Sequence, residues 1–186
     1  MAEAVQTKVT AEEFARLPET NLPTELIDGE IIRIAAPKDV HQGISIALLQ
    51  KLLGLIDGGV LRYSPSDVYL DEYNVVQPDI FWVSGPDSKC KLGEDDTWHG
   101  ASDLTVEIHA MGAGLRDRRE KFQLYEKYGT REYWLVHPGD RYIEEFQLVR
   151  GRFKRVGLFG PGETFESPLL GGKAVDLKAV FEVKPA

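Results

Sequence analysis

The sequence has one cysteine, Cys90, among its 186 residues, and no apolar run that approaches the ~20 residues of a membrane-spanning helix. A single cysteine excludes an intrachain disulfide and any cysteine-rich zinc site. Carboxylates and four histidines remain as candidate metal ligands, so hard cations that prefer oxygen ligands are favoured. The lack of a long apolar run predicts a protein without a transmembrane segment.

The first residues, MAEAVQTKV, have neither the basic start nor the apolar run of a secretory signal peptide. This predicts a cytoplasmic protein. The sequence also lacks low-complexity tracts and internal repeats, and it has no shift in composition that would indicate a linker. A hydrophobic fraction of 42% and a charged fraction of 28% are ordinary for a globular protein, so we predict one domain over residues 1–186.

An excess of basic residues is also absent, since the net charge is −8 and the isoelectric point is about 5.1. Such a charge repels nucleic acid overall and argues against a protein that coats DNA. It does not exclude a local basic groove. The basic residues gather in two clusters, Arg116, Arg118, Arg119 and Lys121, and Arg150, Arg152, Lys154 and Arg155.

Short-range patterns predict the order of the helices and strands. A capping box from Thr10 to Glu13 starts a short helix that ends near Leu17. Asp28-Gly29 joins two strands of a hairpin over residues 25–35, and apolar spacing predicts an amphipathic helix over 39–56. Further strands are expected at 60–64, 67–71, 75–84, 104–110, 132–138, 142–149 and 151–159, with a polar loop at 85–102 and a helix at 116–128. This order predicts an α/β or α+β domain with a mixed sheet.

The segment LTVEIHAMGAGLRDRREKFQLYEKYG, residues 104–129, allows two interpretations. In the first, Gly112 and Gly114 form a phosphate-binding turn between a strand and a helix. A dinucleotide fingerprint needs a third glycine, but Asp117 stands there, and its carboxylate would repel a diphosphate at the helix start. The fingerprint also usually opens its domain, so this interpretation is disfavoured.

In the second interpretation, an acid within the strand binds a metal. Alternation along the strand places Glu107 on the face opposite Leu104, Val106 and Ile108, and a strand that leads into a crossover helix is usually covered on both faces. A buried carboxylate needs a counterion, and an arginine or lysine would suffice. Asp79, after Pro78 and before an apolar run, is a second acid in the same situation. Two such acids close together favour a divalent cation between them.

A lysine follows on the predicted helix. Asp117, Lys121, Tyr125 and Gly129 recur every four residues along one helix face, so Lys121 can reach back toward the strand of Glu107. The alternative is an ordinary surface ion pair between Asp117 and Lys121, which contributes only tenths of a kcal/mol.

Taken together, the motifs TAEEF, ELIDGE, HQGI, NVVQPDIFWVS, DLTVEI, D-x-x-x-K-x-x-x-Y-x-x-x-G, REYWLVHP and SPLLGG resemble, in this order, the Uma2-like (DUF820) family of endonucleases. The resemblance implies a restriction-endonuclease-like core of the PD-(D/E)xK superfamily. It also implies that Asp79, Glu107 and the upstream acid Glu25 bind Mg²⁺ or Mn²⁺. Lys121 takes the place of the lysine that usually follows the strand acid by two residues. The implied activity is metal-dependent hydrolysis of DNA phosphodiester bonds.

The chain departs from the family after the strand acid, where His109-Ala110-Met111-Gly112-Ala113 replaces a segment with serine, proline and threonine. His109 stands where many superfamily members have their lysine, and we interpret it as a partly buried histidine rather than a proton-transfer group. Two other classes of function stay open. One is a nuclease-like fold that binds nucleic acid or a protein without cutting. The other is an assembly protein. We expect a homodimer, because duplex cleavage needs two sites or one used twice, and apolar strands such as DVYL and EYWLV offer contact surface.

Overall fold

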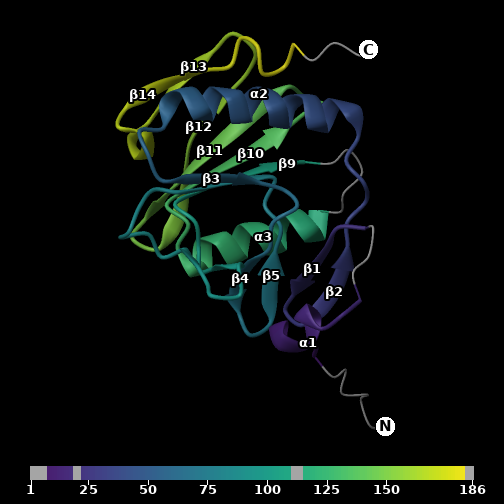
Figure 1. Ribbon diagram of the computed structural model, residues 1–186. Coiled ribbons are helices and arrows are strands. Elements are labelled where there is room, and N and C mark those ends of the chain that lie inside the picture. Colours follow the sequence, from purple (N-terminus) through teal and green to yellow (C-terminus); the bar gives the residue numbers. More distant parts are fainter. Residues whose placement is uncertain (1–7, 19–21, 110–114, 183–186) are drawn as a thin grey trace.

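A computed structural model describes residues 8–18, 22–109 and 115–182, with the side chains of 115–118 excepted (Figure 1). The chain forms a mixed α+β fold, as the sequence predicts. None of the helices in these ranges is both long and apolar enough to cross a membrane.

The N-terminal elements follow the local sequence signals. Helix α1 (Ala11–Ala15) starts with a capping box, in which Thr10 Oγ1 accepts from the Glu13 amide and Glu13 Oε2 accepts from the Thr10 amide. Strands β1 (Thr24–Ile27) and β2 (Glu30–Arg33) form an antiparallel hairpin. Its turn residues, Asp28 and Gly29, both have positive φ angles, at 50° and 79°.

The hairpin belongs to the first of two six-stranded sheets, in which the strand order is β2-β1-β5-β4-β8-β7. The other strands of this sheet are β4 (Val68–Asp71), β5 (Asn74–Val76), β7 (Lys91–Leu92) and β8 (Trp98–His99). The pair of β4 and β8 is parallel, and the remaining pairs are antiparallel.

The second sheet has the order β12-β11-β10-β9-β6-β3. It is built from β3 (Val60–Tyr63), β6 (Ile80–Val83), β9 (Leu104–Ile108), β10 (Glu132–His137), β11 (Tyr142–Val149) and β12 (Arg152–Phe159). Strands β9 and β10 are parallel neighbours, and helix α3 (Leu115–Tyr128) forms the crossover between them. All six residues of β10 are buried, as is usual for a central strand that is covered on both faces.

Helix α2 (Asp39–Leu55) covers one face of the second sheet, and α3 covers the other (Figure 1). Leu48 and Leu52 of α2 pack on Ile80, Val106 and Trp134. The small hairpin of β13 (Thr164–Ser167) and β14 (Lys173–Asp176), with the 3₁₀ helix Pro168–Leu170 between them, closes this core.

A second core fills the space between the two sheets, where α3 lies. Tyr125 of α3 contributes to a buried cluster with Phe81 and Tyr133 of the second sheet and Val68 and Val76 of the first. Helix α3 therefore contacts both sheets, and its side chains can join residues from both.

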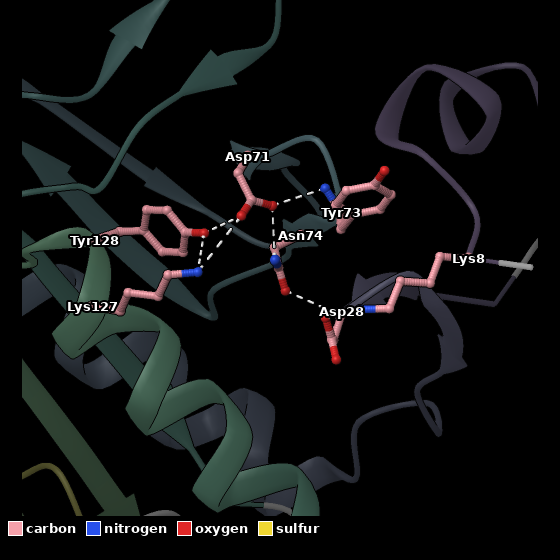
Figure 2. Close-up of polar contacts among 7 residues, drawn as sticks. All are labelled: Lys8, Asp28, Asp71, Tyr73, Asn74, Lys127 and Tyr128. Carbon is pink, nitrogen blue, oxygen red and sulfur yellow. Dashed lines mark hydrogen bonds and ion pairs between the residues drawn. The ribbon is translucent and has the colours of Figure 1, made fainter.

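A polar network fixes the C-terminal end of α3 to the first sheet, as Figure 2 shows. The Tyr128 hydroxyl donates to Asp71 Oδ2, and Lys127 Nζ lies 3.8 Å from the same oxygen. Asp71 Oδ1 accepts from Asn74 Nδ2 at 2.7 Å, and Asn74 Oδ1 accepts from the amide of Asp28 at 2.9 Å. The network connects the helix end with the β4–β5 turn and, through that turn, with the β1–β2 turn.

Four features differ from the sequence-based expectation. The strands divide into two sheets instead of extending one. The segment 85–102, expected as a loop, contains the short strands β7 and β8, and the hairpin of β11 and β12 is followed by β13 and β14. The strand EYWLV is buried and offers no contact surface for a dimer. Burial depends on partners distant in sequence, which the local pattern does not identify.

Buried acids in β11 and β10 make the stability of the fold pH-dependent. Glu145 is fully buried, and burial raises its pKa to about 7, although a hydrogen bond from Gln147 opposes the shift. Burial also raises the pKa of Glu132. Between the ordinary value of 4.5 and about 7 the folded protein therefore binds more protons than the unfolded chain. The contribution of Glu145 to stability is full below that window and is lost as pH rises through it.

We therefore expect the urea midpoint of the wild type to fall between pH ~4.5 and ~7 more steeply than that of Glu145→Gln, which has no charge to bury. Glu166→Gln, at an exposed position on β13, is the control and should follow the wild type in this respect. Parallel curves for Glu145→Gln and the wild type would show that Glu145 is not the titrating group.

Candidate active site

The buried ammonium of Lys121 lies between two carboxylates from different strands. Its Nζ is 2.8 Å from Glu25 Oε1, and it is 2.9 and 3.1 Å from the two oxygens of Glu107. Glu25 is completely buried, Lys121 is 7% exposed, and the Glu107 side chain is 12% exposed. An isolated charge would be costly at such a position, so the three side chains depend on one another.

Each partner is brought there by a local regularity. Glu107 alternates with Val106 and Ile108, which point into the core under α2, so its own side chain points toward α3. Lys121 lies one turn before the buried Tyr125, on the helix face that meets the sheet. Glu25 comes from β1 of the first sheet. The cluster therefore forms where the two sheets face each other across α3.

Two hydrogen bonds orient the carboxylates. The Tyr125 hydroxyl donates to Glu107 Oε1 at 2.6 Å. The backbone amide of Gln77 donates to Glu25 Oε1 at 2.7 Å. Because these donors come from the helix and from the chain just after β5, the position of each acid is fixed by residues outside its own strand.

Asp79 lies at the entrance to β6, directly after Pro78, and its side chain is 17% exposed. Asp79 Oδ2 accepts from the Ile108 amide at 2.6 Å, next to Glu107 in β9. Asp79 Oδ1 lies 3.2 Å from Nε2 of His41 in α2. Asp79 thus stands between β9 and the first turn of α2, and it contributes to the electrostatic field at both Glu107 and Lys121.

The cluster places three acids, Glu25, Glu107 and Asp79, around one lysine. Burial raises the pKa of Glu107 to about 8, with Asp79 and Glu25 adding to the shift and Lys121 opposing it. Burial alone would lower the pKa of Lys121, but Glu107 and Glu25 raise it well above its ordinary value, so Lys121 is a cation. Burial likewise acts to lower the pKa of His41, but the Asp79 carboxylate raises it overall. One lysine cannot neutralise three ionised carboxylates, so a further cation or proton is needed.

The donor set suits a hard divalent cation. Within residues 8–18, 22–109 and 115–182, no group of three or more His, Cys, Asp or Glu side chains is arranged as a ready-made metal site. Mg²⁺ does not require one, because it is commonly bound by one or two carboxylates and completes its shell with water and substrate phosphate. Asp79 and Glu107 provide two neighbouring carboxyl groups, and they are the least buried of the three acids.

The structure thus brings together Glu25, Glu107 and Lys121, with Asp79 beside them. His109 is half-buried, its amide donates to Val136 O at 2.8 Å, and its ring lies 5.9 Å from that of His137. Gly112 and Gly114 of the alternative phosphate turn lie outside the described residues, and Asp117 is described only as part of α3.

Neither His41 nor the Tyr125 hydroxyl was predicted from the sequence to belong to the site. For Tyr125 a signal existed, since it recurs on the same helix face as Lys121. For His41 the periodicity of α2 predicts a position on the buried side of the helix, but not contact with Asp79, which is far away in sequence. That contact depends on how α2 docks on the second sheet.

Comparison with known proteins identifies the family of the chain and a solved structure of similar fold. The model of the Uma2 family, described as "Putative restriction endonuclease", matches residues 11–178. A crystal structure of a putative nuclease belonging to DUF820 from Anabaena variabilis aligns with a TM-score of 0.75 at 19% identity. The alignment covers 94% of this chain and 98% of the other. No curated protein matches the chain. The structural alignment with the DUF820 protein supports the restriction-endonuclease-like fold expected from the sequence.

Proposed function

The chain belongs to the Uma2 family of putative restriction endonucleases, and from this premise we propose that it hydrolyses DNA phosphodiester bonds with the help of Mg²⁺ or Mn²⁺. The observation that carries the proposal is the buried group of Glu25, Glu107 and Lys121, with Asp79 at its edge. A site with more carboxyl groups than cationic side chains can bind a metal cation. A cation-dependent phosphodiesterase requires such a site, and the family of this chain is described as one of nucleases.

The residues of the chain would act by position and charge. Asp79 and Glu107 would hold the cation, with Glu25 as a further ligand or as the group that holds Lys121 in place. The Lys121 ammonium would stabilise the charge that develops on the attacked phosphate, or orient the attacking water. Tyr125 would keep Glu107 in its orientation through the 2.6 Å hydrogen bond. When bound, the cation would neutralise phosphate charge and lower the pKa of a bound water.

His41 is a positioning residue in this proposal. Its Nε2 faces Asp79 Oδ1, while Oδ2 is fixed by the Ile108 amide. A cation at Asp79 would compete with the imidazolium for Oδ1, so His41 must become neutral or turn away when the cation binds. The site would therefore bind a cation more tightly at a pH where His41 is neutral.

Mg²⁺ is expected to stabilise the wild-type fold, because it binds the native cluster and relieves repulsion among its acids. At one hundred times the dissociation constant the gain is about 2.7 kcal/mol. The difference between thermal unfolding curves with and without Mg²⁺ measures this gain in stability. Asp79→Ala should abolish the response, and Asp57→Ala, at an exposed position away from the cluster, should retain it. An unchanged response in Asp79→Ala would place the cation elsewhere.

We also propose that the protein acts on duplex DNA as a homodimer, since one cluster attacks one strand at a time and two-fold dimers are the commonest homo-oligomers. Exposed apolar residues on β12, Val156 and Leu158, offer contact surface that EYWLV does not. Light scattering should give twice the 20.8 kDa chain mass at micromolar concentration. A mass of one chain that persists on concentration would exclude the dimer and favour nicking or a single-stranded substrate.

A nuclease assay on linear, supercoiled and single-stranded DNA with either cation tests the activity itself. Binding of DNA without cleavage in every case would instead support a nuclease-like fold that recognises nucleic acid without cutting it.

A further inference from the structure

Two basic clusters that are separate in the sequence come together where α3 packs on β12. The ring of Phe122 in α3 lies 5.1 Å from that of Phe153 in β12. Glu126, one turn further along α3, accepts from Arg152 Nη1 at 2.8 Å and from the Phe153 amide at 2.6 Å. Arg119 is exposed and precedes Glu126 by two helical turns, so it lies on the same face of α3. The junction of α3 and β12 therefore carries arginines from both clusters.

Two of these arginines are held by carboxylates and still face solvent. Arg155 Nη1 donates to Glu144 Oε2 at 2.8 Å, as Arg152 Nη1 does to Glu126. The two arginine side chains are 82% and 57% exposed, whereas those of Glu126 and Glu144 are 13% and 15% exposed. A guanidinium has five N–H donors, so one carboxylate contact leaves most of them for another anion. The exposed charge at both pairs is therefore positive, and its donors are already oriented.

The arginines lie beside the proposed active site in the second sheet. Glu107 of β9 pairs with Leu135 of β10, which pairs with Glu144 of β11. Residues opposite each other on neighbouring strands point to the same face, so Glu107 and Glu144 both point toward α3. Neighbouring strands are about 4.8 Å apart, which places β12 about 14 Å from β9. One strand of B-DNA rises about 3.4 Å per nucleotide, so this separation equals about four nucleotides.

This position matters because the protein as a whole repels DNA. The net charge is −8, and Glu25, Asp79 and Glu107 add carboxyl groups where the cleaved phosphate has to lie. Cations a few nucleotides away attract the backbone without occupying the proposed cation site. Arg152 and Arg155 are three residues apart on β12, or about 10 Å, so they reach different phosphates.

We infer that Arg119, Arg152 and Arg155 form a track for the phosphates of DNA, here called the arginine track, which aligns the strand with Asp79 and Glu107. Guanidinium groups match phosphate oxygens in a bidentate geometry, and groups already held in place lose less entropy on binding. Contacts with phosphates carry no base preference, so the track sets the path of the strand and not its sequence. The inference rests on the proposed function for the role of the strand, but contact with DNA does not depend on cleavage.

Binding of fluorescent duplex DNA to the metal-free protein tests the track without cleavage. Anisotropy titrations between ~50 and ~200 mM salt give the slope of log affinity against log salt, and each lost phosphate contact should reduce this slope by about 0.9. The triple variant Arg119→Ala/Arg152→Ala/Arg155→Ala should therefore reduce it by about 2.7, and it should bind at least about tenfold more weakly near 100 mM salt.

Arg16→Ala is the matched control. Arg16 is an exposed arginine that pairs with Glu12 at 2.5 Å, and its helix α1 lies far from β12 (Figure 1). The variant removes the same charge and should keep the wild-type slope. Each single variant should unfold within about 4 °C of the wild type, because exposed ion pairs contribute little to stability. A wild-type slope in the triple variant, or equal losses in Arg16→Ala, would overturn the track.

The outcomes also separate the track from the nuclease proposal. DNA binding that depends on the three arginines, without cleavage in Mg²⁺ or Mn²⁺, would support the track and overturn the nuclease. Cleavage by the triple variant at the wild-type rate, with the wild-type salt dependence, would support the nuclease and overturn the track. If the triple variant does not fold, the single variants decide, since each should lose about one third of the change in slope.

Discussion

Asp79→Asn is expected to lower the rate of cation-dependent DNA cleavage by about a hundredfold to ten-thousandfold. This range corresponds to several kcal/mol of lost transition-state stabilisation. Asparagine retains an oxygen that can accept the hydrogen bond from the Ile108 amide, so the fold around β6 and β9 should persist. What is lost is the charge that would hold the cation. Initial rates on plasmid DNA with saturating Mg²⁺ or Mn²⁺ measure the effect.

Two further variants separate this result from general damage. Glu107→Gln should lose activity to a similar extent, because it also removes a charge from the proposed cation site. Asp57→Asn makes the same chemical change at an exposed ion pair with Lys173 and should cleave at the wild-type rate. Wild-type activity in Asp79→Asn would show that Asp79 takes no part in the reaction. Loss of activity in all three variants would point to misfolding, whereas equal activity in all three would point to a contaminating nuclease.

Lys121→Met should lower the free energy of unfolding by about 3–5 kcal/mol, the usual cost of leaving a buried charge without its partner. Glu25 and Glu107 would both lose their ammonium contact in a region that excludes water. Urea unfolding of the metal-free protein measures the loss. Because the pKa of Glu107 is already raised to about 8, acidifying the buffer protonates this group more readily and should reduce the loss.

The same helix provides a matched control. Lys127 pairs with Asp71 at 3.8 Å, and its side chain is 64% exposed, so Lys127→Met should cost less than about 1 kcal/mol. The double variant Lys121→Met/Glu107→Gln should be more stable than the sum of the two single changes predicts, because the second change removes one of the stranded charges. Equal losses in Lys121→Met and Lys127→Met would contradict the electrostatic role assigned to Lys121.

The approach of Lys121 to Glu107 could be predicted from the sequence because it depends on two short-range regularities. Alternation along β9 points Glu107 away from the core residues Val106 and Ile108, and the four-residue spacing in α3 places Lys121 on the face that returns to the sheet. Because β9 and β10 are parallel and α3 connects them, α3 packs on the sheet, and the side chains of Lys121 and Glu107 face each other. The capping box at Thr10 and the turn at Asp28-Gly29 were predictable for the same reason.

The contacts that complete the site depend on long-range pairing. Glu25 reaches Lys121 only because β1 pairs with β5 in the first sheet, and this sheet faces the second sheet across α3. His41 reaches Asp79 only because α2 docks above β6. The register between such distant segments is selected by the packing of the whole core, and no local spacing in the sequence specifies it.

The dispersal of the site along the chain has a consequence during protein synthesis. A ribosome releases Glu25 first, then Asp79 and Glu107, and Lys121 last, and β10, which pairs with the strand of Glu107, follows still later. A nascent chain that ends before α3 holds the acids without the ammonium between them, so it cannot assemble the cluster. Products that terminate before α3 therefore lack the cluster. For a protein that would cut DNA, this order keeps the hazard out of such short chains.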